Sequence, residues 1–328
     1  MNGFVYVQTN DAEQNQVIVF GRKADGTLER LSGYPTGGKG SGEPHLPSQS
    51  SVVLDRDRLF VTNAGSDDVT QFAVEGEQLR LVDRVPSGGS TPRSVAVHRD
   101  WVYVLNTGGE PSVARLGESA FALPEGSDLA QVAFTPDGRT LLVTDRATDS
   151  IHAFAVEDDG ALGARVTHRS SGATPYGFDV TAAGVLVVTE AAGAQVGKAS
   201  ASSYRLESPA QLEPVSGAVG NTRSEVCWAV VSNDGRIAFV TNFGDGTIST
   251  YAIGDDGSIE LREAVAATTV EGGPGIRDEA LSSDGQFLYA LHADTGRVFG
   301  WRVGAEGALA AIDSANGLPL TAAGLAAS

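Results

Sequence analysis

Hydrophobic and polar residues alternate along most of the chain in short runs, and glycine-rich turns separate these runs. The runs have the two-residue period of β-strands with one buried face. One pattern recurs seven times: an alternating strand, a polar residue at its end, a glycine-rich turn and a second strand. The seven strand endings read VYVQTN, LFVTN, VYVLN, LLVTD, LVVTE, AFVTN and LYALH. This repeat predicts an all-β protein and excludes helical repeats.

The polar residue that ends each copy, called the anchor below, sets the length of the repeat. The anchors are Asn10, Asn63, Asn106, Asp145, Glu190, Asn242 and His292, and successive anchors are 53, 43, 39, 45, 52 and 50 residues apart. This spacing is typical of a four-stranded propeller blade and too long for a leucine-rich repeat. The sequence therefore predicts one domain over residues 1–328, a seven-bladed β-propeller with four antiparallel strands in each blade.

The two ends of the chain complement each other. The first copy lacks an innermost strand before it, and the C-terminal stretch LPLTAAGLAAS has the pattern of an innermost strand without a blade. We expect the C-terminal strand to pair with the N-terminal blade, because closure removes exposed sheet edges.

The anchors and the starts of the innermost strands define a candidate site. In an antiparallel meander, the loop that enters a blade and the loop after its second strand lie on the same face. We therefore expect the anchors and the starts of the innermost strands to meet on one face, at one mouth of the central channel. The candidate residues are His45, Gln49, Arg93, Gln131, Tyr176, Arg223, Glu225, Trp228, Arg277, Asp278 and Glu279, with the anchors Glu190, Asn242 and His292.

These candidates include groups with useful chemistry. The three arginines would suit a carboxylate, a phosphate or a developing oxyanion. Glu190 and His292 are titratable, so either could act as a general acid or base, or could instead form hydrogen bonds between blades. The asparagine anchors are consistent with turn capping, and Trp228 is consistent with packing between blades.

Composition narrows the set of partners. The chain has 23 Lys and Arg against 41 Asp and Glu, a net charge of −18, which repels nucleic acids and anionic membranes. The single cysteine, Cys227, has no partner for an internal disulfide or a thiolate metal site. No apolar run has transmembrane length, and the first strand begins at Phe4, leaving no room for a signal peptide. We expect a soluble, cytoplasmic monomer that acts on a small molecule.

Several motifs are absent or incomplete. The segment GYPTGGKG from Gly33 lacks the Ser or Thr of a phosphate-binding P-loop. No G-x-S-x-G, H-E-x-x-H or C-x-x-C is present, so serine hydrolase, zinc protease and thiol redox chemistry have no support. We assign no metal and no cofactor.

The chain resembles a known family. Its FVTN segments resemble the YVTN-type propeller repeat, and the whole chain is similar to the seven-bladed β-propeller lactonase family through segments such as QVAFTPDGRTLLVTD, TPYGFDV, TNFGDGTISTY and DEALSSDGQFLYAL. The family contains 6-phosphogluconolactonase-like enzymes and muconate cycloisomerase-like propellers. The resemblance implies a site of His, Arg and Glu side chains in the channel mouth, matched here by Glu190, Arg93 and Arg277. A histidine on an early innermost strand is not matched, because SQSSVVL has Gln49 and Ser50 there.

Three functional hypotheses follow. In a lactonase, Arg93 and Arg277 would hold the carbonyl or acid group of the substrate, and Glu190 or His292 would activate water. A cycloisomerase or cyclase would use the same site without consuming water. A ligand-binding or scaffold propeller would catalyse nothing, since a fold does not determine a function.

Overall fold

The computed structural model describes residues 1–44, 46–47, 49–118, 120–270 and 273–328. These residues form seven four-stranded sheets, which confirms the predicted all-β, seven-bladed propeller. The helical elements among them are three short 3₁₀ turns, η1 (Ala192–Ala194), η2 (Ala293–Thr295) and η3 (Ala305–Gly307). No helix in the described ranges is long and apolar enough to cross a membrane.

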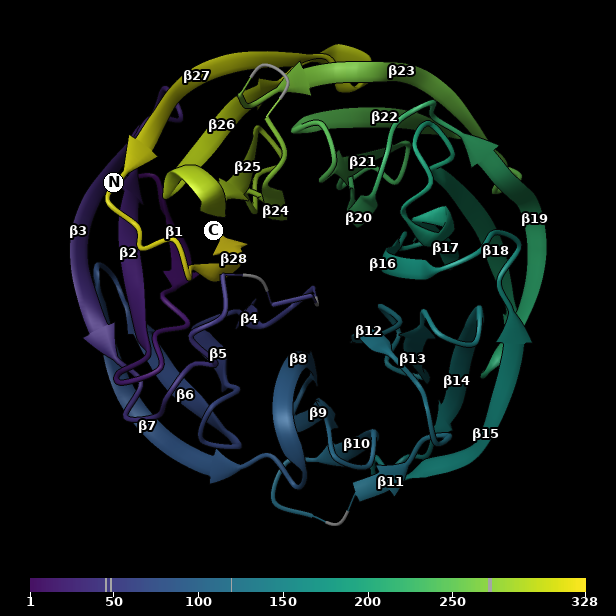
Figure 1. Ribbon diagram of the computed structural model, residues 1–328, viewed down its shortest axis with the longest axis horizontal. Helices are drawn as coiled ribbons and strands as arrows, with labels where there is room; N and C mark the ends of the chain where they lie inside the picture. The colour runs from purple at the N-terminus through teal and green to yellow at the C-terminus, as the bar shows by residue number, and fades with distance from the viewer. Residues whose placement is uncertain (45, 48, 119, 271–272) are drawn as a thin grey trace. The chain divides into compact units, whose positions relative to one another are not determined.

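The chain divides into two compact units, which we describe separately. Unit 1 contains residues 1–126, 277–303 and 310–328, and unit 2 contains residues 127–276 and 304–309. Figure 1 labels the strands of both units.

Unit 1 contains four of the sheets, apart from a terminal residue of β24 and of β27. In spatial order, the sheets are β28 (Ala323–Ala327), β1 (Gly3–Gln8), β2 (Gln16–Arg22), β3 (Leu28–Pro35); β4 (Val52–Asp55), β5 (Arg58–Asn63), β6 (Asp68–Glu75), β7 (Gln78–Pro86); β8 (Ser90–His98), β9 (Trp101–Gly108), β10 (Ser112–Arg115), β11 (Ala120–Ala122); and β24 (Ile276–Leu281), β25 (Phe287–His292), β26 (Arg297–Val303), β27 (Leu309–Asn316).

Unit 2 contains the other three sheets. They are β12 (Leu129–Phe134), β13 (Thr140–Asp145), β14 (Ser150–Val156), β15 (Leu162–Arg169); β16 (Pro175–Val180), β17 (Val185–Glu190), β18 (Ser200–Ser208), β19 (Gln211–Gly220); and β20 (Val226–Val231), β21 (Ile237–Asn242), β22 (Thr247–Ile253), β23 (Ile259–Thr268). The first strand of each of the seven sheets is called its inner strand below.

Burial falls across each sheet from the second strand to the fourth. Every residue of β13, β17, β21 and β25 is buried, whereas β7, β19 and β23 are mostly exposed or half-buried. The second strands therefore have nearly continuous apolar sequences, because both of their faces pack against neighbouring sheets. The fourth strands keep the alternation of a solvated surface strand.

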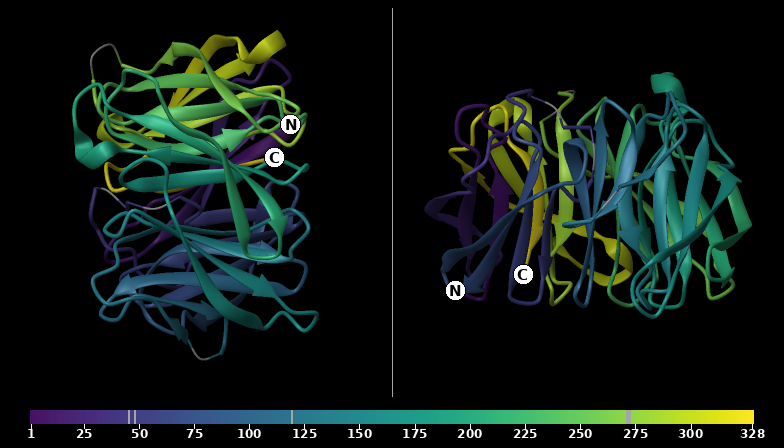
Figure 2. Two further views of the ribbon diagram at one scale, coloured as in Figure 1. Left: turned by 90° about the vertical axis from the view of Figure 1, so that its right-hand side faces the viewer. Right: turned by 90° about the horizontal axis from the view of Figure 1, so that it is seen from below.

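The C-terminal strand completes the N-terminal sheet, as predicted. β28 pairs antiparallel with β1, with Val5 opposite Ala327 and Gln8 opposite Ala323. The Phe4 N–H donates to Ser328 Oγ at 2.8 Å, and the Ser328 N–H donates to the Phe4 carbonyl at 2.9 Å. The two chain ends therefore lie next to each other (Figure 2).

A buried carboxylate also links this closing strand to the last sheet of unit 1. The Gly324 N–H of β28 donates to Asp278 Oδ2 of β24 at 2.7 Å. Gly324 has a φ of +73°, and a Cβ there would lie 2.3 Å from Ser51 Oγ, so only glycine suits this position. Burial raises the pKa of Asp278 to about 6.

The asparagine anchors join neighbouring sheets through side-chain hydrogen bonds. Asn63 Oδ1 accepts from Thr36 Oγ1 at 2.7 Å and from Asn15 Nδ2 at 2.9 Å, both on the preceding sheet's side. Its Nδ2 donates to Asp68 Oδ1 and Thr70 Oγ1 of its own sheet, at 2.7 and 2.8 Å. Asn63 therefore satisfies polar groups where the chain crosses from β3 to β4. This role extends beyond the local turn capping that the sequence suggested.

Asn10 differs from the other anchors. It lies two residues beyond the end of β1, with a φ of +50°. Its Nδ2 donates to Ser41 Oγ at 2.9 Å and to the Glu43 carbonyl at 3.0 Å, so it organises the loop that leads towards β4.

Replacing Asn63 with alanine removes four buried hydrogen bonds and leaves the groups that bond to Asn63 without that partner. We therefore expect a loss of about 2–4 kcal/mol in the free energy of unfolding. Urea unfolding followed by circular dichroism measures this loss. Asn316→Ala, an exposed change on β27, is the matched control and should stay within about 0.5 kcal/mol of the wild type. Equal unfolding midpoints for the two variants would contradict the linking role of Asn63.

The Asp278–Gly324 link should make stability depend on pH in a defined direction. A raised pKa in the folded state means that folding favours the protonated carboxyl, so this contribution is present at low pH and is lost as pH rises through about 6. Relative to Asp278→Asn, the wild type should lose on the order of 1 kcal/mol of stability between pH 5 and pH 8. Chemical denaturation of both proteins at several pH values tests this, and a pH-independent difference would refute it.

Candidate functional site

The inner strands of unit 1 lie side by side in the order β8, β4, β28, β24 (Figure 1). The Val95 N–H of β8 donates to the Ser50 carbonyl, just before β4, at 2.8 Å. Gly324 of β28 approaches Ser51, and its N–H bonds to Asp278 of β24. In unit 1, Arg93 on β8, Gln49 just before β4 and the charged residues of β24 therefore belong to inner strands that lie next to one another, or to the loop that leads into one.

Strand β24 has an unusual composition for a buried strand. Arg277, Asp278 and Glu279 follow one another, and each is at most 5% exposed. Burying three ionisable side chains costs several kcal/mol each unless partners compensate. An apolar strand would pack here without that cost, so these residues are the strongest functional candidates in the chain.

Arg277 is held at the point where this cluster reaches solvent. Its Nη2 lies 3.2 Å from Asp294 Oδ1, on the turn η2 that follows β25. The Asp294 side chain is 46% exposed, whereas that of Arg277 is 6% exposed. The ion pair therefore orients the guanidinium from the solvent side. Sequence reasoning missed Asp294, although its position two residues after an anchor was a usable signal.

His292 ends β25 and is buried among structural partners. Its Nδ1 lies 3.2 Å from Thr295 Oγ1, and its ring is 5.9 Å from the ring of Phe299 on β26. Phe299 belongs to β26, the strand that pairs with β25, so this ring contact lies within one sheet.

Gln49 and Arg93 lie on either side of the backbone contact between β4 and β8. Gln49 precedes Ser50, which has a φ of +66°, and Arg93 lies two residues before Val95. Gln49 is buried and Arg93 is half-buried. His45, the remaining candidate in this part of the chain, lies outside the described residues.

In unit 2, Gln131 connects neighbouring inner strands. Its Nε2 donates to the Phe178 carbonyl at 3.0 Å, and its Oε1 accepts from the Phe178 N–H at 2.7 Å. Asp179 makes a related contact one sheet further on, accepting from the Val231 N–H at 2.8 Å, and burial raises its pKa to about 6. Gln131 and Asp278 therefore both form side-chain hydrogen bonds to the backbone of the next inner strand.

Glu190 is surrounded by hydrogen-bond donors. Its Oε1 accepts from Ser202 Oγ at 2.6 Å, the Gly172 N–H at 2.7 Å and Ser170 Oγ at 3.1 Å, and its Oε2 accepts from Ser200 Oγ at 2.7 Å. Three of these donors are on Oε1 and one is on Oε2 of a carboxylate that is fully buried. Glu190 thus joins the crossover after β15 to its own sheet, as Asn63 does in unit 1.

Tyr176 and Trp228 pack together in unit 2. Their rings meet edge to face with centroids 4.8 Å apart, and Arg146 lies over the tyrosine ring at 4.6 Å and donates to its hydroxyl at 2.7 Å. Within the described residues, the buried Trp228 Nε1 has no hydrogen-bond partner. Both rings therefore have the packing role that the sequence suggested for Trp228, and ligand contact by either stays a prediction.

Arg223, Glu225 and Asn242 lie at the anchor end of the third sheet of unit 2. Arg223 Nη1 lies 3.4 Å from Asp245 Oδ2, and about a third of its side chain is exposed. Glu225 has a φ of +52° and accepts from the Phe243 N–H through its carbonyl. Asn242 accepts from Asn221 Nδ2 at 2.8 Å and donates to Ser249 Oγ at 2.9 Å, so it is another sheet-linking anchor.

In the part of the chain that the structure describes, no three His, Cys, Asp or Glu side chains lie together in a way that could hold a metal ion. Cys227 is buried and not in a disulfide.

Comparison with curated proteins gives one partial relative. The 6-phosphogluconolactonase of Sodalis glossinidius (strain morsitans) is 28% identical over 151 residues, which cover 40% of this chain. The match spans 45% of the length of that relative.

Solved structures share the fold over nearly the whole chain. A functionally unknown protein from Desulfotomaculum acetoxidans DSM 771 matches with a TM-score of 0.78 at 15% identity, covering 100% of this chain and 99% of that one. The periplasmic gluconolactonase of Pseudomonas aeruginosa matches with a TM-score of 0.75 at 17% identity, covering 99% and 98%. At these identities the likeness supports the fold alone.

The family comparison covers almost all of the sequence. The family described as "Lactonase, 7-bladed beta-propeller" matches residues 4–115, 112–195 and 189–317. These ranges contain every described sheet-linking anchor and the charged strand β24. The chain therefore belongs to the seven-bladed β-propeller lactonase family.

Proposed function

We propose that this protein hydrolyses a small lactone, with Arg277 and Glu279 of β24 as its reacting groups and Arg93 as a second anion-binding group. The observation that carries the proposal is the run of three buried ionisable residues on an inner strand. Because the chain belongs to the lactonase family, we assign lactone hydrolysis as the reaction of these residues.

The contacts and positions of these residues suggest which one is the base and which one stabilises the oxyanion. Asp278 accepts from the Gly324 N–H and Glu190 accepts from four donors, so both carboxylates also hold parts of the fold together. The His292 ring lies 5.9 Å from the Phe299 ring. We assign Glu279 as the base that takes a proton from water, because it lies two residues from Arg277 on the same face of β24. Arg277, oriented by Asp294, stabilises the oxygen that becomes negative.

The reaction balances with water alone. The water oxygen bonds to the lactone carbonyl carbon as Glu279 takes its proton, and the carbonyl oxygen becomes an oxyanion beside Arg277. The ring C–O bond then breaks, the ring oxygen takes the proton, and a hydroxy acid leaves. No redox partner or resident cofactor is required.

Hydrolysis of a panel of lactones, phosphorylated and not, followed by acid release in a pH-stat tests this proposal. Glu279→Gln should lower kcat by about 10²- to 10⁴-fold with little change in KM, because a base acts in the transition state. Arg277→Ala should lower kcat/KM for the same substrates. Glu190→Gln should instead lower the melting temperature, since its new amide donors would face existing donors.

Solvent oxygen-18 separates hydrolysis from cyclisation. A lactonase places one solvent oxygen in the acid product, whereas a cyclase or isomerase places none. If no lactone in the panel is opened faster than in buffer, the hydrolase proposal fails. Unchanged turnover in Glu279→Gln would remove that residue from the mechanism.

A further inference from the structure

The turn after β25 carries a carboxylate where the other six copies of the repeat have a small side chain. Two positions after each of the other anchors, the sequence has Ala12, Gly65, Gly108, Ala147, Ala192 and Gly244. The corresponding residue after His292 is Asp294, in the turn η2. This turn belongs to the same sheet as the charged strand β24. The unusual turn residue and the unusual inner strand therefore occur together.

The ion pair between Asp294 and Arg277 needs a fixed turn. The Asp294 side chain is 46% exposed, and its Oδ1 lies 3.2 Å from Arg277 Nη2. An exposed carboxylate is solvated by water and loses side-chain entropy when it pairs, so such a pair contributes little unless its geometry is held. For Asp294 to keep the buried guanidinium in one orientation, the backbone that carries it must therefore be held in place.

Contacts at both ends hold this turn. Thr295 Oγ1 donates to the His292 carbonyl at 3.2 Å and lies 3.2 Å from His292 Nδ1. A hydroxyl has one proton, so both contacts are satisfied when the Nδ1–H of the imidazole donates to Thr295. At the other end, the Leu318 N–H donates to the Gly296 carbonyl at 3.2 Å. Gly296 has a φ of +60°, and a Cβ there would lie 2.3 Å from the Leu318 carbonyl oxygen, so the turn is packed against this segment. Asp294 lies between these two points.

Unit 2 contains the same contact without the carboxylate. Asp145 Oδ2 accepts from Thr148 Oγ1 at 2.8 Å, and Thr148 is three residues after its anchor, as Thr295 is. In both sheets the anchor pairs with the residue five positions later, and both threonines are exposed. The residue two positions after Asp145 is Ala147, which has no charge. Thr148 therefore holds a turn of the same kind that has no carboxylate at this position.

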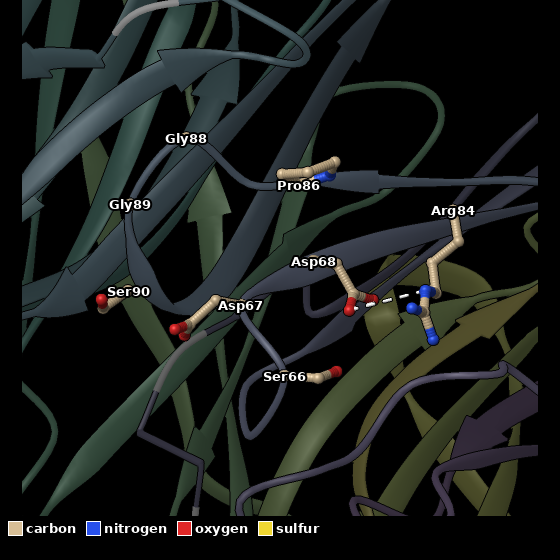
Figure 3. A pocket seen from close by; sticks show the side chains of 8 residues that line it. All are labelled: Ser66, Asp67, Asp68, Arg84, Pro86, Gly88, Gly89 and Ser90. Carbon is tan, nitrogen blue, oxygen red and sulfur yellow. Dashed lines mark ion pairs between the residues drawn. The ribbon is translucent and has the colours of Figure 1, made fainter.

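A second anchor in unit 1 fixes a carboxylate that pairs with an arginine. Asn63 Nδ2 donates to Asp68 Oδ1 at 2.7 Å, and Asp68 Oδ2 lies 3.7 Å from Arg84 Nε (Figure 3). Arg84 is an exposed residue of the outer strand β7. Arg277 is a buried residue of an inner strand, so an anchor that fixes its partner acts on a group of the proposed site.

We propose that His292 and Thr295 are positioning residues for lactone hydrolysis. Through their mutual contact they fix η2, so that Asp294 holds the Arg277 guanidinium where the oxyanion forms. This inference rests on the proposed function, which makes Arg277 the group that stabilises the oxyanion. His292 acts through its neighbours and transfers no proton to the substrate.

The first test follows Arg277 directly. Arginine side-chain NMR spectra of the full chain are recorded for the wild type and its variants, with Arg277→Lys to assign the signal. An ion pair slows rotation of the guanidinium, so the wild type should show separate Nη signals for Arg277. Thr295→Val and Asp294→Ala should average these signals. Thr148→Val, the matched control, and Thr295→Ser, which keeps the hydroxyl, should leave them separate.

The second test uses a lactone that the wild type opens. Thr295→Val should lower kcat about 10-fold and change KM less than about twofold, because a misplaced group costs transition-state stabilisation. Thr295→Ser should recover most of this loss, and Thr148→Val should match the wild type. In the Asp294→Ala background, Thr295→Val should cause no further loss, because the hydroxyl acts through the carboxylate.

His292 is tested with two variants. His292→Leu cannot donate to Thr295 and should lower kcat as Thr295→Val does. His292→Asn introduces the residue of four other anchors, and its amide can donate to Thr295, so it should recover most of the loss. The pH profile of kcat should keep its shape in His292→Asn. Loss of one limb of that profile would make His292 an acid or base and overturn its positioning role.

The outcomes separate the two proposals. Equal kcat values for Thr295→Val and Thr148→Val, or a further loss from Thr295→Val in the Asp294→Ala background, would overturn the positioning proposal while the lactonase stands. If no lactone is opened, the lactonase proposal fails, and the NMR signals of Arg277 decide whether Thr295 holds this side chain. Averaged Arg277 signals in the wild type would overturn the positioning proposal by themselves.

Discussion

The structure depends on satisfying polar groups where the chain crosses from the outer strand of one sheet to the inner strand of the next. The crossovers carry buried polar groups, and a buried hydrogen-bonding group without a partner is costly. A side chain at the end of the second strand bonds to such groups: the Thr36 hydroxyl for Asn63, the Asn221 amide for Asn242, and the Gly172 N–H and Ser170 hydroxyl for Glu190. Asn63 and Asn242 do this with amides, and Glu190 does it with a carboxylate that accepts four hydrogen bonds. Removing such a side chain would leave its buried partners without a hydrogen bond.

This requirement limits which residues are available for chemistry. Glu190 accepts four hydrogen bonds from its own sheet and from the crossover before it, so it has a structural role whatever else it does. Strand β24 is different, because its charged side chains follow one another on an inner strand and one of them pairs with an exposed aspartate. The family match supplies a reaction class for these groups, and the proposed mechanism assigns them their roles.

Repetition allows one part of the chain to be used as a reference for another. The Asp67–Thr91 and Asp149–Thr174 crossovers have the same backbone contacts, which shows that the positive φ angles of these residues belong to the fold. The side chains at equivalent positions differ: Tyr204 and Ser171 in unit 2 correspond to Leu116 and Gly88 in unit 1.

The sequence by itself determined the architecture of this protein. Strand alternation, glycine-rich turns and the spacing of the anchors predicted seven four-stranded blades, because these signals act between residues close in the chain. The missing inner strand of the first copy then predicted the C-terminal closing strand. The tertiary structure decided what each polar residue does. The donors around Glu190 come from segments up to 20 residues away, and Asp278 meets Gly324 across 46 residues. Such contacts depend on how strands of different sheets are set against one another, and no local pattern encodes that arrangement.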